Sequence, residues 1–174
     1  GLLQNEQSLV LKTCDLKDGA GRAAFKTVNY DMRNYKRLKM WVHAEPTTDG
    51  VIPANFEETG DLRLFIRLGS NFISNYYEYE MPLAPSDPNG PQSPENIWRN
   101  QVDFSIQDLN RVKQLRNDRR DVGTASFTEK FIDQIADGQT IAVLGNPQLN
   151  NIKNIMIGIR NPKMMVVQSV QKFG

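Results

Sequence analysis

Strict two-residue alternation between residues 61 and 83 restricts the fold of this chain more than any other feature. DLRLFIRLG (61–69) alternates aliphatic residues with arginine or phenylalanine, and YYEYEMPL (76–83) alternates tyrosine or methionine with tyrosine or glutamate. Successive side chains of a strand point to opposite faces, so each stretch is typical of a half-buried β-strand. The six residues between them, SNFISN, predict an antiparallel hairpin.

The two faces of this hairpin differ in chemistry. One face is apolar and is expected in the core: Leu62, Leu64, Ile66, Leu68, Tyr77, Tyr79 and Met81. The other face mixes charged and aromatic residues: Arg63, Phe65, Arg67, Tyr76, Glu78 and Glu80. Opposite charges facing each other across two strands contribute about 0.2–1 kcal/mol per pair. Two of the three tyrosines are therefore expected in the core, with Tyr76 facing outward.

Further strands are predicted along the chain by alternation or by short apolar runs. They are Ser8–Cys14, Ala23–Asn29, Leu38–Glu45, Asn100–Ile106, Thr140–Gly145, Asn154–Asn161 and Met164–Phe173. The stretch that contains Phe127 and Phe131 has no clear pattern and is left unassigned.

One helix is predicted in SIQDLNRVKQLRND (residues 105–118), where apolar residues recur at every third position: Ile106, Leu109, Val112 and Leu115. Ser105 and Asp108 have the spacing of a capping box, in which both side chains satisfy backbone donors of the first turn. Such a helix is expected to cover one edge of the sheets, and docking to a partner is the alternative.

Two long loops interrupt the strands. One runs from Pro46 to Gly60, and the other runs from Ala84 to Trp98 and contains four prolines. Many strands, one short helix and two long loops predict an all-β fold, an antiparallel β-sandwich of the jelly-roll or galactose-binding-like kind, as a single domain over residues 1–174. An immunoglobulin-like sandwich is the second choice, since its cysteine and tryptophan spacing is absent.

Composition excludes several classes of function. The 174 residues carry a net charge of +1, which gives no reason to expect nucleic acid or an anionic membrane surface as a partner. One histidine, His43, and one cysteine, Cys14, cannot build a structural zinc site. No cofactor and no metal are expected. No apolar run reaches the roughly 20 residues of a membrane helix. Because the chain opens on Gly1 instead of methionine, we expect a fragment of a longer protein.

An outward-facing patch is the candidate binding site. If the strand Leu38–Glu45 lies in the same sheet as the hairpin, its outward residues join the hairpin's polar face. The candidate residues are then Trp41, Arg63, Phe65, Arg67 and Tyr76. Aromatic and arginine side chains are enriched in protein interfaces and sugar platforms. A solvated sheet face, or a face covered by one of the long loops, is the alternative interpretation.

Catalysis is difficult to assemble from this inventory. Glu78 and Glu80 would place their carboxylates roughly 7 Å apart on one strand, which is the separation seen in inverting glycosidases. However, only E-x-E is present, and the cross-strand arginines would keep these carboxylates ionised, whereas one must be a general acid. No G-x-S-x-G motif surrounds any serine. We expect the chain not to be an enzyme.

The longest phrases resemble a known family. LLQNEQSLVLKTCDLKDGAGRAAFKTVNYDMRNYKRLKMWVHAE and GDLRLFIRLGSNFISNYYEYEMPL are similar to segments of the SprA/Sov family, the giant outer-membrane β-barrel translocons of the type IX secretion system of Bacteroidetes, which in some members serve gliding motility. The resemblance covers most of residues 2–83 and includes no catalytic motif. It implies one soluble domain inserted between barrel strands and exposed to the extracellular space or the periplasm.

Two functions follow as hypotheses. The first is a non-catalytic structural or interaction domain of that translocon, which contacts other envelope proteins of the secretion system or secreted cargo. The alternative is a carbohydrate-binding module of a Bacteroidetes surface protein, because NYDMRNYKRLKMWVHAE is also similar to the opening strand of carbohydrate-binding jelly rolls. Loss of sugar binding on replacing Trp41 and Tyr76 would favour the module.

Overall fold

The fold is an antiparallel β-sandwich with unequal layers. The computed structural model describes residues 8–13, 16–17, 19–45 and 62–162. Within these residues the elements are β1 (Gly21–Tyr30), β2 (Arg37–Val42), β3 (Arg63–Gly69), β4 (Tyr76–Pro82), α1 (Pro94–Ile97), β5 (Asn100–Ser105), α2 (Ile106–Asp121), β6 (Phe131–Ala136), β7 (Gln139–Leu144) and β8 (Ile152–Arg160). The predicted all-β class is confirmed.

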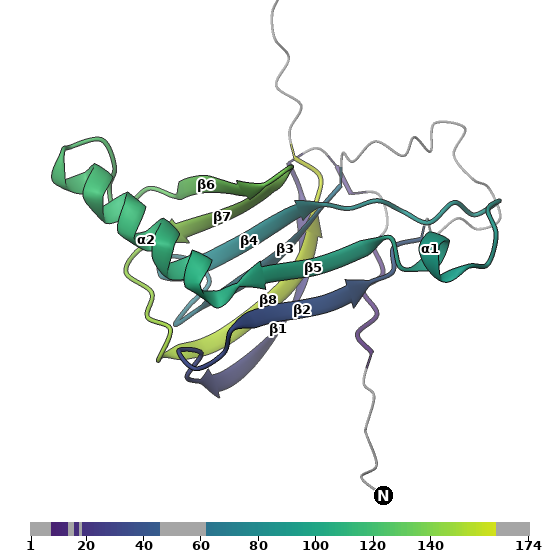
Figure 1. Cartoon of the computed structure of the whole chain (residues 1–174), viewed down its shortest axis with the longest axis horizontal. Helices are drawn as coiled ribbons and strands as arrows, with labels where there is room; N and C mark the ends of the chain where they lie inside the picture. The colour runs from purple at the N-terminus through teal and green to yellow at the C-terminus, as the bar shows by residue number, and fades with distance from the viewer. Residues whose placement is uncertain (1–7, 14–15, 18, 46–61, 163–174) are drawn as a thin grey trace, which may run out of the picture.

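The two layers contain six strands and two strands. The larger sheet has the order β1-β8-β3-β4-β7-β6, and the smaller pairs β2 with β5. Figure 1 shows the β2–β5 ribbon in front of the larger sheet, with α2 beside β6 and β7. The layers meet where the Tyr79 ring stacks on the Phe104 ring, with centroids 4.5 Å apart. The core therefore lies between β5 and the inner face of the larger sheet.

The predicted hairpin is present and sets the register of the larger sheet. Leu64 lies opposite Met81, Ile66 opposite Tyr79, and Leu68 opposite Tyr77. These six side chains are all buried, so the predicted core face is confirmed. On the other side of β3, β8 adds its own alternating isoleucines to the same face. The opposite face of β3 and β4 points away from the sandwich.

Helix α2 closes one end of the core. The Ser105 hydroxyl caps it by accepting a hydrogen bond from the Gln107 amide at 3.2 Å. The helix buries Ile106, Leu109 and Val112, as predicted. The fourth buried position is Arg116 and not Leu115, because a helix advances 100° per residue and a strict three-residue repeat drifts around its axis.

Other predictions need correction. The sequence predicts a strand over Ser8–Cys14, but residues 8–13 form neither helix nor strand. Three predictions lie outside the described residues: Cys14 as the end of that strand, the Pro46–Gly60 loop and the strand Met164–Phe173. The unassigned stretch around Phe131 begins β6. That strand is an edge strand, and its inward-facing side includes Asp133, which bonds Arg111 at 3.0 Å, so its apolar alternation is interrupted.

The loop from Ala84 to Trp98 is held by buried and local hydrogen bonds. The Asn100 side chain bonds the backbone N–H and C=O of Ala84 at 2.7 and 2.8 Å. The Asn96 side chain bonds the backbone of Asp87 and Pro91. The loop also contains the short helix α1, capped by Ser93. This loop is therefore tied to β5 despite its prolines.

Candidate binding site on the outer face of the large sheet

The structure brings together four of the five predicted patch residues and separates the fifth. Arg63, Phe65 and Arg67 on β3 share the outer face of the larger sheet with Tyr76 on β4. Trp41 lies on β2, in the other sheet, and is 57% exposed on the opposite surface of the sandwich. The single patch that includes Trp41 is therefore wrong, because β2 pairs with β5 and never joins the hairpin's sheet.

The aromatic members of the patch are not exposed. Phe65 and Tyr76 each expose 5% of their surface although they face away from the core. The guanidinium carbon of Arg160 lies 4.2 Å from the Phe65 ring centroid, and that of Arg67 lies 4.0 Å from the Tyr76 ring centroid. Two arginines thus cover two rings in cation–π contacts. Phe65 and Tyr76 cannot serve as exposed anchors, which corrects that part of the prediction.

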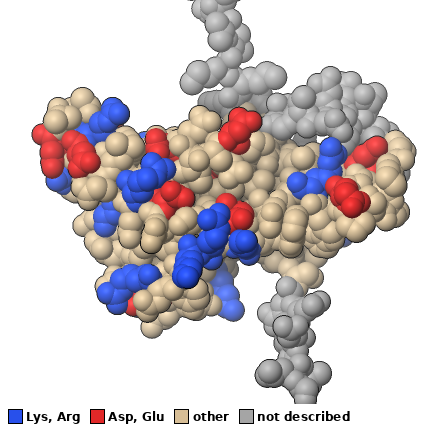
Figure 2. All heavy atoms as spheres, in the orientation of Figure 1, with Lys and Arg blue, Asp and Glu red and all other residues tan. Residues whose placement is uncertain are grey.

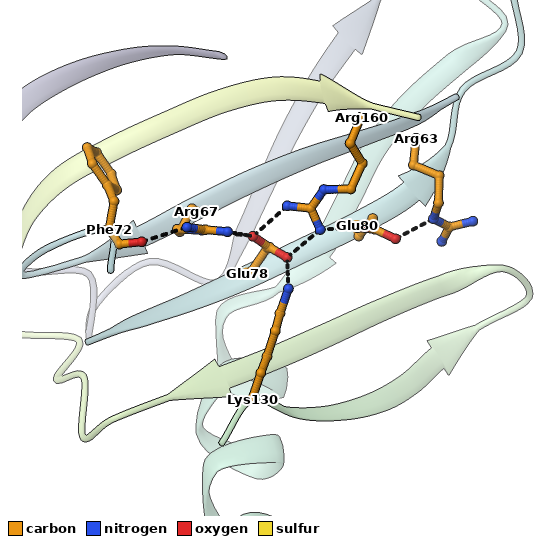
Figure 3. Close-up of polar contacts among 7 residues, drawn as sticks. All are labelled: Arg63, Arg67, Phe72, Glu78, Glu80, Lys130 and Arg160. Atoms are coloured by element: carbon orange, nitrogen blue, oxygen red, sulfur yellow. Dashed lines mark hydrogen bonds and ion pairs between the residues drawn. The ribbon is translucent and has the colours of Figure 1, made fainter. Parts of the chain in front are cut away.

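A buried carboxylate organises this face. Glu78 on β4 is 1% exposed and accepts hydrogen bonds from three cations, as Figure 3 shows. Arg67 donates through two nitrogens at 2.8 and 2.6 Å, and Arg160 through two nitrogens at 2.9 and 3.0 Å. Lys130, which precedes β6, donates to the same carboxylate. Glu78 therefore joins three neighbouring strands to the segment before β6.

A second carboxylate extends the network along β4. Glu80 accepts from Arg160 at 2.5 Å and also pairs with Arg63. Arg63 in turn donates to the Gly138 carbonyl at 2.6 Å, and Arg67 donates to the Phe72 carbonyl at 2.6 Å. The expected cross-strand ion pairs are thus present, with Arg160 bridging both glutamates (Figure 3).

The charge state of Glu78 follows from its partners. Burial alone would raise the pKa of this carboxyl, but the hydrogen bond from Arg160 and the charge of Lys130 lower that pKa to about 2. A group with such a pKa is ionised at neutral pH and holds no proton to donate. This geometry disfavours Glu78 as the general acid of a glycosidase.

Sequence reasoning missed two members of the network. Lys130 lies in the stretch left unassigned, and Arg160 ends a strand whose place beside β3 was not predicted. The sequence indicated only that two arginines and two glutamates share one face of adjacent strands. No local pattern indicated that Lys130 and Arg160, which lie roughly 50 and 80 residues from Glu78, would join them.

An open hollow lies on this outer face beside the network. Its volume is about 580 Å³, and its lining includes three cations of the network, Arg67, Lys130 and Arg160, together with Arg22 of β1. No aspartate or glutamate is among the described residues that line it. Where the hollow borders β1, positions 19–21 and 23 are glycine or alanine and add no large side chain to its lining. The arrangement fits an anionic group.

A smaller hollow lies at the other surface of the sandwich, near α1. Its volume is about 140 Å³, and its lining includes His43, Glu45, Asp87 and Asn96. The His43 ring lies edge-on to Trp98 with centroids 6.0 Å apart. Within residues 8–13, 16–17, 19–45 and 62–162, no cluster of three histidine, cysteine, aspartate or glutamate side chains is arranged to hold a metal ion.

Comparison with known families decides the identity of the chain. The sequence model of SprA_N, described as a motility-related/secretion protein, matches residues 2–173. The chain belongs to the SprA_N family. A search of curated proteins and a search of solved structures each find no match. The described part of this SprA_N chain has no helix that is long and apolar enough to cross a membrane.

Proposed function

We propose that this SprA_N chain is a non-catalytic structural and interaction domain of an outer-membrane protein-secretion translocon of the type IX system, serving gliding motility in Bacteroidetes. Family membership supports the secretion and motility assignment. The domain is exposed to the extracellular space or the periplasm, and its partners are envelope proteins of the system or secreted cargo.

The observation that carries the non-catalytic part of this proposal is the environment of Glu78. This residue is one of the two glutamates that the sequence offers for acid–base chemistry, and three cations from β3, β8 and the segment before β6 enclose it. Its lowered pKa removes the proton that acid catalysis needs. The network thereby acts as a cross-link between strands, which suits a rigid scaffold for binding.

The direct test is removal of residues 8–162, in frame, from the full-length protein in its own cells. We expect cargo secretion and gliding to fall while the shortened protein still accumulates in the envelope, and the unaltered gene to restore both. A second arm offers the purified chain glycans, esters, peptides and nucleotides and expects no turnover. Unchanged secretion in cells that carry the deletion, or turnover of any substrate that Glu78→Gln abolishes, contradicts the proposal.

A carbohydrate-binding module is the second candidate, favoured by the exposed indole rings of Trp41 and Trp98. Trp41 is 57% and Trp98 is 47% exposed. Trp41 lies on β2 and Trp98 just precedes β5, and these two strands form the smaller sheet. Flat aromatic faces are what sugars stack on. A glycan array decides: specific binding that Trp41→Ala and Trp98→Ala abolish, and that Ile132→Ala leaves intact, supports the module. No binding to any glycan removes it.

A further inference from the structure

Strand β1 has a free edge, since no strand of the described residues pairs with its outer side. It is the outermost strand of the six-stranded sheet, and it is ten residues long. The Asn161 amide donates to the Ala20 carbonyl at 2.9 Å, and the Leu83 amide donates to the Leu62 carbonyl at 2.9 Å. Antiparallel pairs alternate between bonded and non-bonded positions. The first bond shows that residue 20 directs its backbone toward β8, and alternation extends this to residues 22, 24 and 26. The second bond shows that the even-numbered residues of β3 bond β4, so the odd-numbered residues of β3 bond β8, and the other residues of β8 are left to bond β1.

The backbone groups of the intervening residues of β1 therefore point away from the sheet. These residues are Gly21, Ala23, Phe25 and Thr27. Among the described residues, the Gly21 carbonyl accepts from the Arg22 side chain at 3.0 Å. A row of outward N–H and C=O groups is a template onto which another extended chain can add as a strand.

The same end of β1 borders the cationic hollow. Gly21 and Ala23 face the outer surface and carry no bulky side chain, so they leave the way open from the strand edge to Arg160 and Lys130. Four cations of the network, Arg63, Arg67, Lys130 and Arg160, stand against two carboxylates, Glu78 and Glu80, which leaves a net charge of +2.

An apolar contact lies farther along the same edge. Phe25 is 69% exposed on the outer face of β1 and meets the Phe72 ring edge-on, with centroids 5.7 Å apart. Phe25 is two residues from Ala23 and four from Gly21, which is a separation of roughly 7–14 Å along a strand. The edge thus presents a cationic position and an aromatic position on the same face.

We propose that the free edge of β1 binds an extended segment of a partner protein that carries a carboxylate, and that this carboxylate enters the cationic hollow beside Gly21 and Ala23. An apolar side chain two or four residues away in the segment packs on Phe25. The inference rests on the proposed interaction function and names the chemistry of the partner. A peptide fits better than a nucleic acid, because the chain's net charge is only +1 and its other face, shown in Figure 2, intersperses both signs.

The test selects peptides from a displayed library of random twelve-residue sequences on the whole 174-residue chain, and then measures synthetic copies of the winners by fluorescence anisotropy. We expect enriched aspartate or glutamate with an apolar residue two or four positions away. Binding should slow hydrogen exchange at the amides of Ala23, Phe25 and Thr27. The amides of residues 22, 24 and 26 should change little, because β8 already protects them.

Two variants probe the two halves of the site without touching the Glu78 network. Arg22→Glu reverses a charge at the free edge beside the hollow, where the Arg22 guanidinium donates to the outward Gly21 carbonyl, and Ala23→Pro removes an outward N–H that β8 does not use. Each should weaken binding about tenfold or more, which corresponds to roughly 1.4 kcal/mol. Arg119→Glu, the same charge change on exposed α2, should leave binding within about twofold. Thermal unfolding of each variant verifies that it folds.

Three outcomes overturn the inference: no enriched peptide, enriched peptides without acidic residues, or full binding in both folded variants. Inorganic phosphate or anionic phospholipid vesicles that bind the chain more tightly than the peptides would instead assign the hollow to a phosphate group. None of these outcomes touches the secretion assay on the deletion, so the proposed function fails or stands separately.

Discussion

Arg67 and Glu78 face each other across the β3–β4 hairpin, and two guanidinium nitrogens of Arg67 donate to one oxygen of Glu78 at 2.8 and 2.6 Å. The other oxygen of Glu78 receives Lys130 and Arg160. A carboxylate that is buried in this way is stable only while its partners remain, because an unpaired buried charge is costly. The outer face of the sheet is therefore held by charge, and the inner face by apolar contact.

Replacing Glu78 tests this cross-link. Glu78→Gln keeps the shape but leaves Arg67 and Lys130 without this anion and Arg160 with Glu80 alone, so we expect the free energy of unfolding at pH 7 to fall by about 3–5 kcal/mol. Urea unfolding measures it. The control is Glu129→Gln, an exposed glutamate next to Lys130 in sequence, which should change stability by less than about 0.5 kcal/mol. Equal effects of both substitutions would show that the network contributes nothing specific.

The same carboxylate makes stability depend on acid. The pKa of Glu78 is lowered to about 2 from an ordinary 4.5, so the folded protein binds this proton less readily than the unfolded chain. The contribution is fully present above pH 4.5 and is lost as pH falls toward 2, and it amounts to about 3 kcal/mol. Unfolding free energies measured from pH 6 to pH 2 should drop less steeply in Glu78→Gln. Parallel acid profiles for the two proteins would contradict this.

Arg116 is a buried cation with no carboxylate partner among the described residues. It is fully buried in α2, its Nη1 and Nη2 find no hydrogen-bond partner in that part of the chain, and its guanidinium lies 4.4 Å from the Phe127 ring. Burial lowers its pKa. Arg116→Met keeps the contact with Phe127 and removes the unsatisfied donors, so thermal and urea unfolding should show a gain of about 1–3 kcal/mol. Arg119→Met, on the exposed side of α2, is the matched control. A clear loss of stability in Arg116→Met would indicate that this guanidinium has a favourable role.

Two glycines with positive φ separate backbone strain from steric clash. Gly145 (φ 71°) and Gly123 (φ 78°) are both left-handed, but a Cβ on Gly145 would lie 2.1 Å from the Ser74 carbonyl oxygen, whereas one on Gly123 meets nothing within 4 Å. Gly123→Ala should cost about 1–2 kcal/mol from conformation alone. Gly145→Ala should cost clearly more, because the β3–β4 connection must move. Comparable urea midpoints of unfolding for the two variants would show that the β3–β4 connection moves aside at little cost in free energy.

Asn100 ties down the proline-containing loop. Its side chain is buried and bonds both backbone groups of Ala84 and, at 3.3 Å, the Val42 carbonyl. Asn100→Ala should lower the free energy of unfolding by about 1–3 kcal/mol and speed proteolytic cleavage between Ala84 and Pro94. Gln101→Ala, an exposed neighbour on β5, should do neither. Rapid cleavage of the unaltered protein in this loop would mean that Asn100 does not protect it.

The amino-acid sequence by itself determined most of the β-strands and the two faces of the β3–β4 hairpin. Alternation placed Leu64, Ile66, Tyr77 and Tyr79 in the core and gathered arginines and glutamates on the other face of the hairpin, and the structure agrees. Alternation is a property of neighbouring residues in one strand, because successive side chains must point to opposite sides of an extended chain. It therefore requires no knowledge of the rest of the molecule.

Only the tertiary structure decided which strands are neighbours and which outward residues are exposed. Trp41 left the predicted patch because β2 pairs with β5, and Phe65 became buried because Arg160, 95 positions along the chain, lies over its ring. The free edge of β1 and the hollow beside it exist because β8 occupies the position between β1 and β3. Strand order arises from long-range packing that minimises exposed apolar surface in the whole domain, and no local pattern in the sequence encodes it.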